Sequence, residues 1–172
     1  MSRGAGGRAP LRQRLLAPIV AQLKQGITPE RIALTLALAA VLGIFPILGA
    51  TTALCGVAAI ALRLNQPLIQ VANYLLTPLH LALLLPFYRA GETLFGQPHV
   101  PIFSVTELLE RFRDGPLQFA VDYGMVGVYG IVVWCLLAPL LAGLLYLSLR
   151  PLLRQLARRL AANPVPPSPS RR

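Results

Sequence analysis

The sequence has little charge and very few acidic residues. Of its 172 residues only 13% are charged, and Asp and Glu together number six against 16 Lys and Arg. An ordinary soluble domain carries about 25% charged residues. This chain therefore lacks the polar surface of a soluble globular enzyme, and we expect a membrane protein.

Cysteine and histidine are also scarce, with two of each. Cys55 and Cys135 lie in apolar runs, without the paired spacing of a metal site or a disulfide scaffold. His80 and His99 lie apart from any carboxylate pair. The sequence also has no Ser-His-Asp pattern and no phosphate-binding glycine loop. We therefore expect no enzymatic activity, no cofactor and no metal.

Long uncharged runs are the main feature that is present. Residues 32–62, 64–88 and 123–149 contain no Asp, Glu, Lys or Arg. A membrane-spanning helix needs about 20 predominantly apolar residues. The second and third runs meet this length, and we predict that each is one span, with Arg150 ending the last.

The first run has a helix start before it and a break in its middle. Thr28 is a suitable N-cap, and Pro29 is a proline at the first helical position. Pro46 then interrupts the apolar sequence, and Gly49 follows it closely. We predict a helix that begins near Pro29, breaks at Pro46 and Gly49, and is followed by a second helix.

The two halves of this run are short. The segments 29–45 and 47–62 would be about 25 and 24 Å long as helices, less than the roughly 30 Å of the hydrocarbon core. We therefore predict a re-entrant helical hairpin over residues 28–62, with two short spans as the alternative. Non-helical backbone at membrane depth needs cover from protein, so the turn should pack against the other helices.

The predicted fold class is all-α: a helical integral membrane protein with a hairpin, two transmembrane helices and flanking interfacial amphipathic helices. Glu92, at the outer end of the first span, is expected to be a solvated charge. The predicted order is a basic segment with an interfacial helix (1–27), a membrane domain (28–150) made of the hairpin (28–62), a span kinked by Pro78 and Pro86 (64–88), an external loop with a short helix (89–122) and a span (123–149), then a basic surface helix and a proline-rich tail (151–172).

The net charge of +10 is concentrated at the two ends of the chain. Lys and Arg near span ends mark the cytoplasmic side, and the loop 89–122 is net negative. We therefore predict a multi-pass protein of the bacterial cytoplasmic (inner) membrane with both termini in the cytoplasm. The basic ends should contact anionic lipid, and no nucleic-acid recognition motif is present.

A polar stripe follows the second uncharged run at intervals of four, three, four and three residues. On a continuous helix these positions fall within an arc of about 80°. Polar side chains are costly in lipid, so the stripe should face protein or water, most simply the broken hairpin. It could join helices by hydrogen bonds or form a polar path or ligand site. Its members are Gln66, Gln70, Asn73, Thr77 and His80.

A series of short motifs points to a known family. The chain carries, in order, Thr28-Pro29-Glu30-Arg31, a small-residue run to Gly43, Phe45-Pro46 with Gly49, Leu64-Asn65-Gln66-Pro67, Asn73 with Thr77-Pro78, and Tyr88 with Gly91. Over about residues 20 to 150 this order resembles the bacterial membrane family catalogued as domain of unknown function 2062. Family members commonly have Pro directly after the asparagine, where Tyr74 stands here, which moves an expected kink to Pro78.

The resemblance implies a small inner-membrane protein without an agreed activity, joined in some bacteria to glycosyltransferase-like or other envelope-related domains. Two functions are therefore open. The first is an integral membrane protein that binds or moves a small lipid or ion through the hairpin and the polar stripe. The second is a scaffold or anchor that binds an envelope-biosynthesis partner or a second copy of the chain.

Overall fold

The computed structural model describes residues 19–22, 26–98 and 105–162. This part of the chain is helical and contains no strand, so the predicted all-α class is confirmed. Most of the predicted N-terminal interfacial helix and the proline-rich tail lie outside the described residues. The helices are α2 (Pro29–Gly43), α3 (Ala50–Ala61), α4 (Gln66–Leu75), α5 (Thr77–Leu94), α6 (Val105–Asp114) and α7 (Pro116–Ala162).

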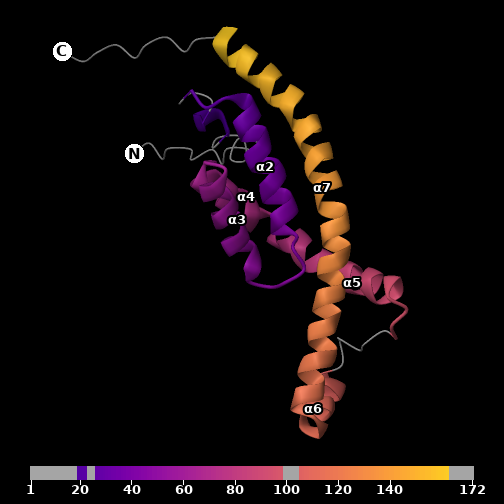
Figure 1. The fold of residues 1–172 in the computed structure, drawn as a ribbon. Helices are drawn as coiled ribbons and strands as arrows, with labels where there is room; N and C mark the ends of the chain where they lie inside the picture. The colour runs from indigo at the N-terminus through magenta and orange to yellow at the C-terminus, as the bar shows by residue number, and fades with distance from the viewer. Residues whose placement is uncertain (1–18, 23–25, 99–104, 163–172) are drawn as a thin grey trace, which may run out of the picture.

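Helix α7 runs along the whole described structure, with the other helices packed beside it (Figure 1). Its 47 residues make it about 70 Å long. The predicted span and the predicted basic surface helix are thus one helix, which continues through Arg150 and Pro151. A proline costs the helix one hydrogen bond and a clash, but Leu153 is buried just beyond it against Ile32 and Ala33 of α2, which holds this turn in the helix.

Helix α2 packs antiparallel to α7. Thr28 caps its start by accepting a hydrogen bond from the backbone N–H of Arg31 at 3.4 Å, as predicted. Glu30 at this end pairs with Arg154 of α7. Near the other end, the indole N–H of Trp134 donates to the carbonyl oxygen of Val41 at 3.0 Å.

Helix α3 returns beside α2 after the predicted break. Gly49 caps α3 with a left-handed φ of 85°, which glycine adopts without steric cost. Helix α4 then packs against both helices, and its Asn65 cap accepts from the backbone N–H of Leu68 at 2.9 Å. Small and branched side chains close the core between these three helices: Ala39, Cys55, Ala59 and Ile69.

Helices α4 and α5 are bent by 63° relative to each other at Leu76. The predicted span over 64–88 thus consists of two helices, and the bend between them lies close to the predicted kink at Pro78. Pro78 accounts for the bend, because a proline has no backbone N–H to donate to the carbonyl of Tyr74 four residues earlier. Pro86, in contrast, lies inside α5 without ending it.

Helix α5 crosses α7 at two glycines. A Cβ on Gly91 would lie 2.6 Å from the backbone carbon of Tyr129, and one on Gly130 would lie 2.8 Å from the ring of Tyr88. The backbones can approach this closely only because both positions lack a side chain. Most of the predicted external loop 89–122 is helical, since it contains the end of α5, the short helix α6 and the start of α7.

Among the described helices, α7 alone is long and apolar enough to cross a membrane by itself. Helices α4 and α5 meet the same criterion when they are taken together as one bent span. Helix α3 is apolar but shorter.

Candidate functional site

The hairpin turn is clamped between α5 and α7. Pro46 is almost completely buried, and its carbonyl oxygen accepts a hydrogen bond of 2.8 Å from the hydroxyl of Tyr88. The ring of Phe45 meets Trp134 of α7 edge-on, with ring centroids 5.0 Å apart. The turn therefore packs against other helices, and its free carbonyl group is satisfied.

The outer part of the turn has a different environment. Ile47, Leu48 and Gly49 are exposed, and a Cβ on Gly49 would meet nothing within 4 Å. Glycine is thus favoured at position 49 by the positive φ, and no neighbouring atom lies close enough to exclude a side chain there. The turn presents an apolar tip on a buried base.

Three residues of the polar stripe bind α3. Gln66 donates to the carbonyl of Gly56 at 3.3 Å, and Gln70 donates to the carbonyl of Thr52 at 3.1 Å. The amide of Asn73 reaches the hydroxyl of the same threonine at 3.4 Å. These three residues of the stripe thus face the second helix of the hairpin, while the Pro46 carbonyl at the break is bound by Tyr88.

Thr77 and His80 lie beyond the bend, on α5. The prediction that all five stripe residues occupy one face of one helix was wrong, because the arc was calculated for a straight helix. Thr77 is exposed and His80 is buried. Among the described residues, His80 Nε2 and Gln70 Oε1 are buried atoms without a hydrogen-bond partner.

Glu92 is completely buried, so its expected role as a solvated charge was wrong. The guanidinium of Arg89 pairs with its carboxylate at 2.7 Å. The neighbouring Gly91 brings α5 onto the backbone of α7, and Glu92 lines a hollow there together with Val126 and Tyr129 of α7. Across the described residues, no group of three or more His, Cys, Asp or Glu side chains could hold a metal ion.

A pocket that the sequence analysis missed lies where α2 begins and α3 passes into α4. Its volume is about 420 Å³. Among the described residues, the charged side chains in its lining are Arg31 and Arg63, both exposed. These arginines flank the first uncharged run, and that flanking was the available sequence signal. The remaining lining residues are Gly26, Ile27, Thr28, Ile32, Thr35, Leu64, Asn65 and Leu68.

Arg63 stands at a backbone position that usually belongs to glycine. Its φ is 51°, and it is the one non-glycine residue with a positive φ in the described chain. The N–H groups of Arg63 and Leu64 donate to the carbonyls of Ile60 and Ala59. This pattern is typical of an α-helix that ends with one residue in the left-handed conformation. A side chain there costs about 1–2 kcal/mol relative to glycine.

Glu30 belongs to a separate charged cluster beside this pocket. It pairs with Arg154 at 2.5 Å and lies 4.0 Å from Arg150. The hydrogen bond from Arg154 lowers the pKa of Glu30 below its ordinary value, and the positive charges of both arginines act in the same direction. The carboxylate of Glu30 is therefore paired with arginines of α7 and does not neutralise the pocket.

Comparison with known protein families identifies the family of this chain. Residues 10–161 match the family model described as "Uncharacterized protein conserved in bacteria (DUF2062)". The chain belongs to DUF2062. The match confirms the resemblance found in the motifs, and it covers the hairpin, the polar stripe and the basic pocket. No curated protein and no solved structure matches the chain, so a function for this DUF2062 member has to be argued from its geometry.

Proposed function

We propose that the chain is a non-enzymatic integral protein of the bacterial inner membrane that holds a lipid at the cytoplasmic face. In this proposal α7 and the bent pair α4–α5 are two spans, and α2–α3 is a re-entrant hairpin. The observation that carries it is the exposure of α7: only 11% of its most apolar 18-residue window is buried inside the protein. Such an apolar surface is stable against lipid and unstable against water.

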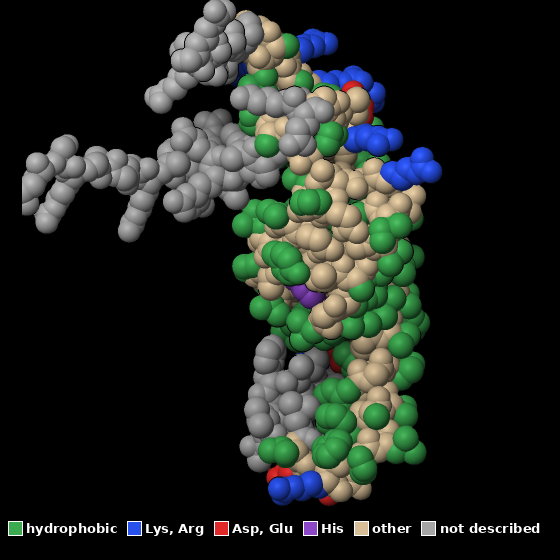
Figure 2. Space-filling view, turned by 90° about the vertical axis from the view of Figure 1, so that its left-hand side faces the viewer, with side chains coloured by type: hydrophobic (Ala, Val, Ile, Leu, Met, Phe, Trp, Pro, Cys, Tyr) green, Lys and Arg blue, Asp and Glu red, His purple; other side chains and the backbone are tan. Residues whose placement is uncertain are grey.

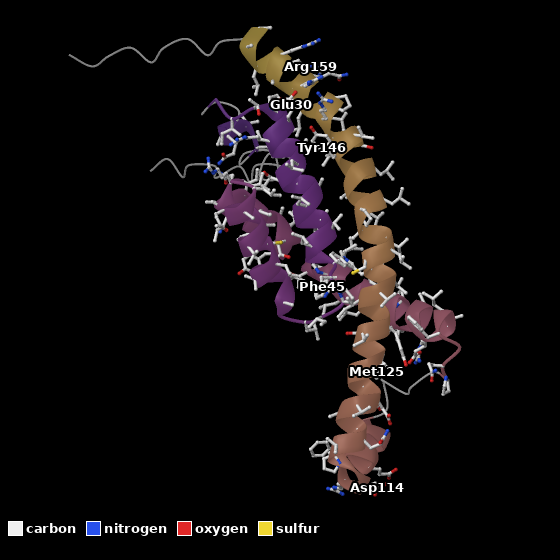
Figure 3. The ribbon with its side chains drawn as sticks, in the orientation of Figure 1. Glu30, Phe45, Asp114, Met125, Tyr146 and Arg159 are labelled. Atoms are coloured by element: carbon white, nitrogen blue, oxygen red, sulfur yellow. The ribbon has the colours of Figure 1, made fainter. Side chains whose placement is uncertain are left out.

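The depth of the turn supports the re-entrant hairpin. Arg31 and Arg63, at the two outer ends of the hairpin, line the same pocket. The turn meets α7 at Trp134, two residues from the middle of the uncharged run 123–149. In Figure 3, Phe45 lies between the end that carries Glu30 and Arg159 and the opposite end at Asp114. A hairpin that entered and left on one side and turned at mid-depth would have this geometry.

The charge distribution supports the orientation. Basic side chains gather at one end of the molecule, hydrophobic side chains cover much of the middle, and the opposite end carries basic and acidic groups together (Figure 2). By the positive-inside rule, the arginine-rich end is cytoplasmic. The arginines of the described residues at this end are Arg31, Arg63, Arg150, Arg154, Arg158 and Arg159.

Cysteine labelling in a Cys55→Ala, Cys135→Ala background tests the proposal. We expect Gln97→Cys to react with an impermeant thiol reagent from outside intact spheroplasts, and Arg159→Cys to react only after permeabilisation. Leu48→Cys, at the tip of the turn, should stay unreactive in both conditions because lipid covers it. Rapid external labelling of Leu48→Cys would contradict the re-entrant hairpin and would indicate two full spans.

Movement of a small ion or lipid along the polar stripe is a second candidate, favoured by the unpartnered buried atoms of Gln70 and His80. Three of the five stripe residues already bond α3, which favours a structural role for them. If the stripe only joins helices, we expect His80→Leu to keep both its membrane abundance and the cellular phenotype, because His80 Nε2 has no hydrogen-bond partner to lose. A lost cellular phenotype at normal abundance would instead support a path. The scaffold function stays a prediction.

A further inference from the structure

The basic pocket between α2 and the α3–α4 junction has the features of a ligand site. We infer that it binds the phosphate headgroup of an anionic phospholipid drawn from the cytoplasmic leaflet. This inference rests on the proposed function, because it needs Arg31 and Arg63 to lie at the membrane surface. It adds a defined site and a defined chemical class of ligand.

The charged hydrogen-bond donors among the described side chains of this pocket are those of the two arginines. Thr28 accepts from the N–H of Arg31, and the hydroxyl of Thr35 donates to the carbonyl of Arg31 at 2.7 Å. Asn65 uses its oxygen to cap α4 and its amide to donate to Gln22 at 2.8 Å. The guanidinium groups are therefore the strongest donors available to an anion, and their fork of N–H groups matches phosphate oxygens.

The charge balance of the pocket also calls for an anion. No carboxylate is present among the described residues that line it. The adjacent acid, Glu30, is paired with Arg154 on the α7 side. The side chain of Arg31 makes one long contact of 3.5 Å, to the carbonyl oxygen of Arg63. Two positive groups in one hollow repel each other, and a phosphate between them would remove that repulsion.

The apolar lining favours a lipid over a free anion. Ile27, Ile32 and Leu68 line the pocket together with the arginines. Ile60 and Leu62, which come shortly before Arg63 in the chain, are 72% and 50% exposed and add apolar surface at the end of α3. A phospholipid can place its phosphate on the arginines and its acyl chains along this surface, whereas soluble phosphate uses only the first of these contacts.

Native mass spectrometry of the purified full-length chain tests the site. The probes are dioctanoyl phosphatidylglycerol, dioctanoyl phosphatidylcholine as the neutral lipid, and inorganic phosphate. We expect Arg31→Gln and Arg63→Gln each to weaken phosphatidylglycerol binding about tenfold, the loss typical of one charged hydrogen-bonding group. Arg159→Gln removes the same charge at the same end of the molecule outside the pocket, and it should leave binding within about twofold.

Arg63→Gly separates binding from folding. Glycine accepts the positive φ at this position, so the variant should melt at a higher temperature than the parent and yet lose phosphatidylglycerol affinity. Retention of affinity in Arg63→Gly would overturn the inference. An equal loss in Arg159→Gln would also overturn it, because binding would then be general attraction to a basic surface.

The probes distinguish the two possible phosphate sources and the two proposals. Inorganic phosphate that bound as tightly as phosphatidylglycerol would overturn the choice of a lipid, and so would equal affinity for phosphatidylcholine. If the cysteine labelling gives the expected topology and the pocket variants bind lipid normally, the headgroup site alone is wrong. If Arg159→Cys is labelled from outside, the proposed orientation is wrong, and the site cannot serve the cytoplasmic leaflet.

Discussion

The hydroxyl of Tyr88 donates a hydrogen bond of 2.8 Å to the carbonyl oxygen of Pro46, 42 residues earlier in the sequence. The bond joins α5 to the irregular turn between α2 and α3. The ring that carries this hydroxyl lies against Gly130 of α7. Three elements thus meet at one side chain, and the break in the hairpin depends on it.

Tyr88→Phe should therefore destabilise the protein. The ring stays, but the buried carbonyl of Pro46 loses its partner, at a cost of about 1–3 kcal/mol. Denaturation of the purified protein in detergent measures this loss. Tyr74→Phe is the control, because Tyr74 is 61% exposed and should change stability little. Equal stability of the two variants would contradict a role for the hydrogen bond.

Gly91→Ala should separate α5 from α7. Its Cβ would lie 2.6 Å from the backbone carbon of Tyr129, and a backbone atom cannot rotate out of the way. Overpacking of this kind costs about 1–3 kcal/mol. Gly124→Ala is a matched control within a helix, because its Cβ would meet nothing within 4 Å. A melting temperature of Gly91→Ala at or above that of Gly124→Ala would show that the crossing is looser than described.

Gly49→Ala should destabilise the turn through its backbone alone. The φ of 85° costs an alanine about 1–2 kcal/mol, although the site has open space. Gly143→Ala, also in open space but helical, should instead stabilise by about 0.5–1 kcal/mol. Thermal unfolding of the two variants should therefore shift in opposite directions, and shifts of the same sign would argue against the left-handed turn.

Glu30→Gln should lower stability at neutral pH and lose its effect in acid. The pKa of Glu30 is lowered from 4.5 by the hydrogen bond from Arg154, so the folded state favours the charged carboxylate. Its contribution is complete above pH 4.5 and is lost as the pH falls through the lower folded pKa. Melting curves of both proteins across this range measure the difference. A difference in melting temperature that persisted unchanged at the lowest pH would show that it does not come from the negative charge of Glu30. Asp114→Asn, at the opposite end of the molecule, is the control for the loss of one carboxylate.

Local features of the helices could be predicted from the sequence. Thr28, Pro46 and Gly49 act through the backbone of their own segment, so the helix start and the hairpin break were found where the structure has them. The kink assigned to Pro78 is likewise close to the bend at Leu76. The absence of charge over long runs indicated a membrane protein before any contact was known, because lipid solvation depends on composition and length.

The size of the bend and the partners across the helices were decided only by the tertiary structure. A bend of 63° rotates His80 away from the direction of Gln66, which no count of residues per turn can foresee. Glu92 is buried next to residues of α7, and Arg31 shares a pocket with Arg63 because the start of α2 and the end of α3 lie at the same end of the molecule. Periodicity reports which face of a helix is apolar, but contacts between distant segments depend on how whole helices pack. For this reason the sequence determined where the helices start and break, and the packing determined which residues form a site.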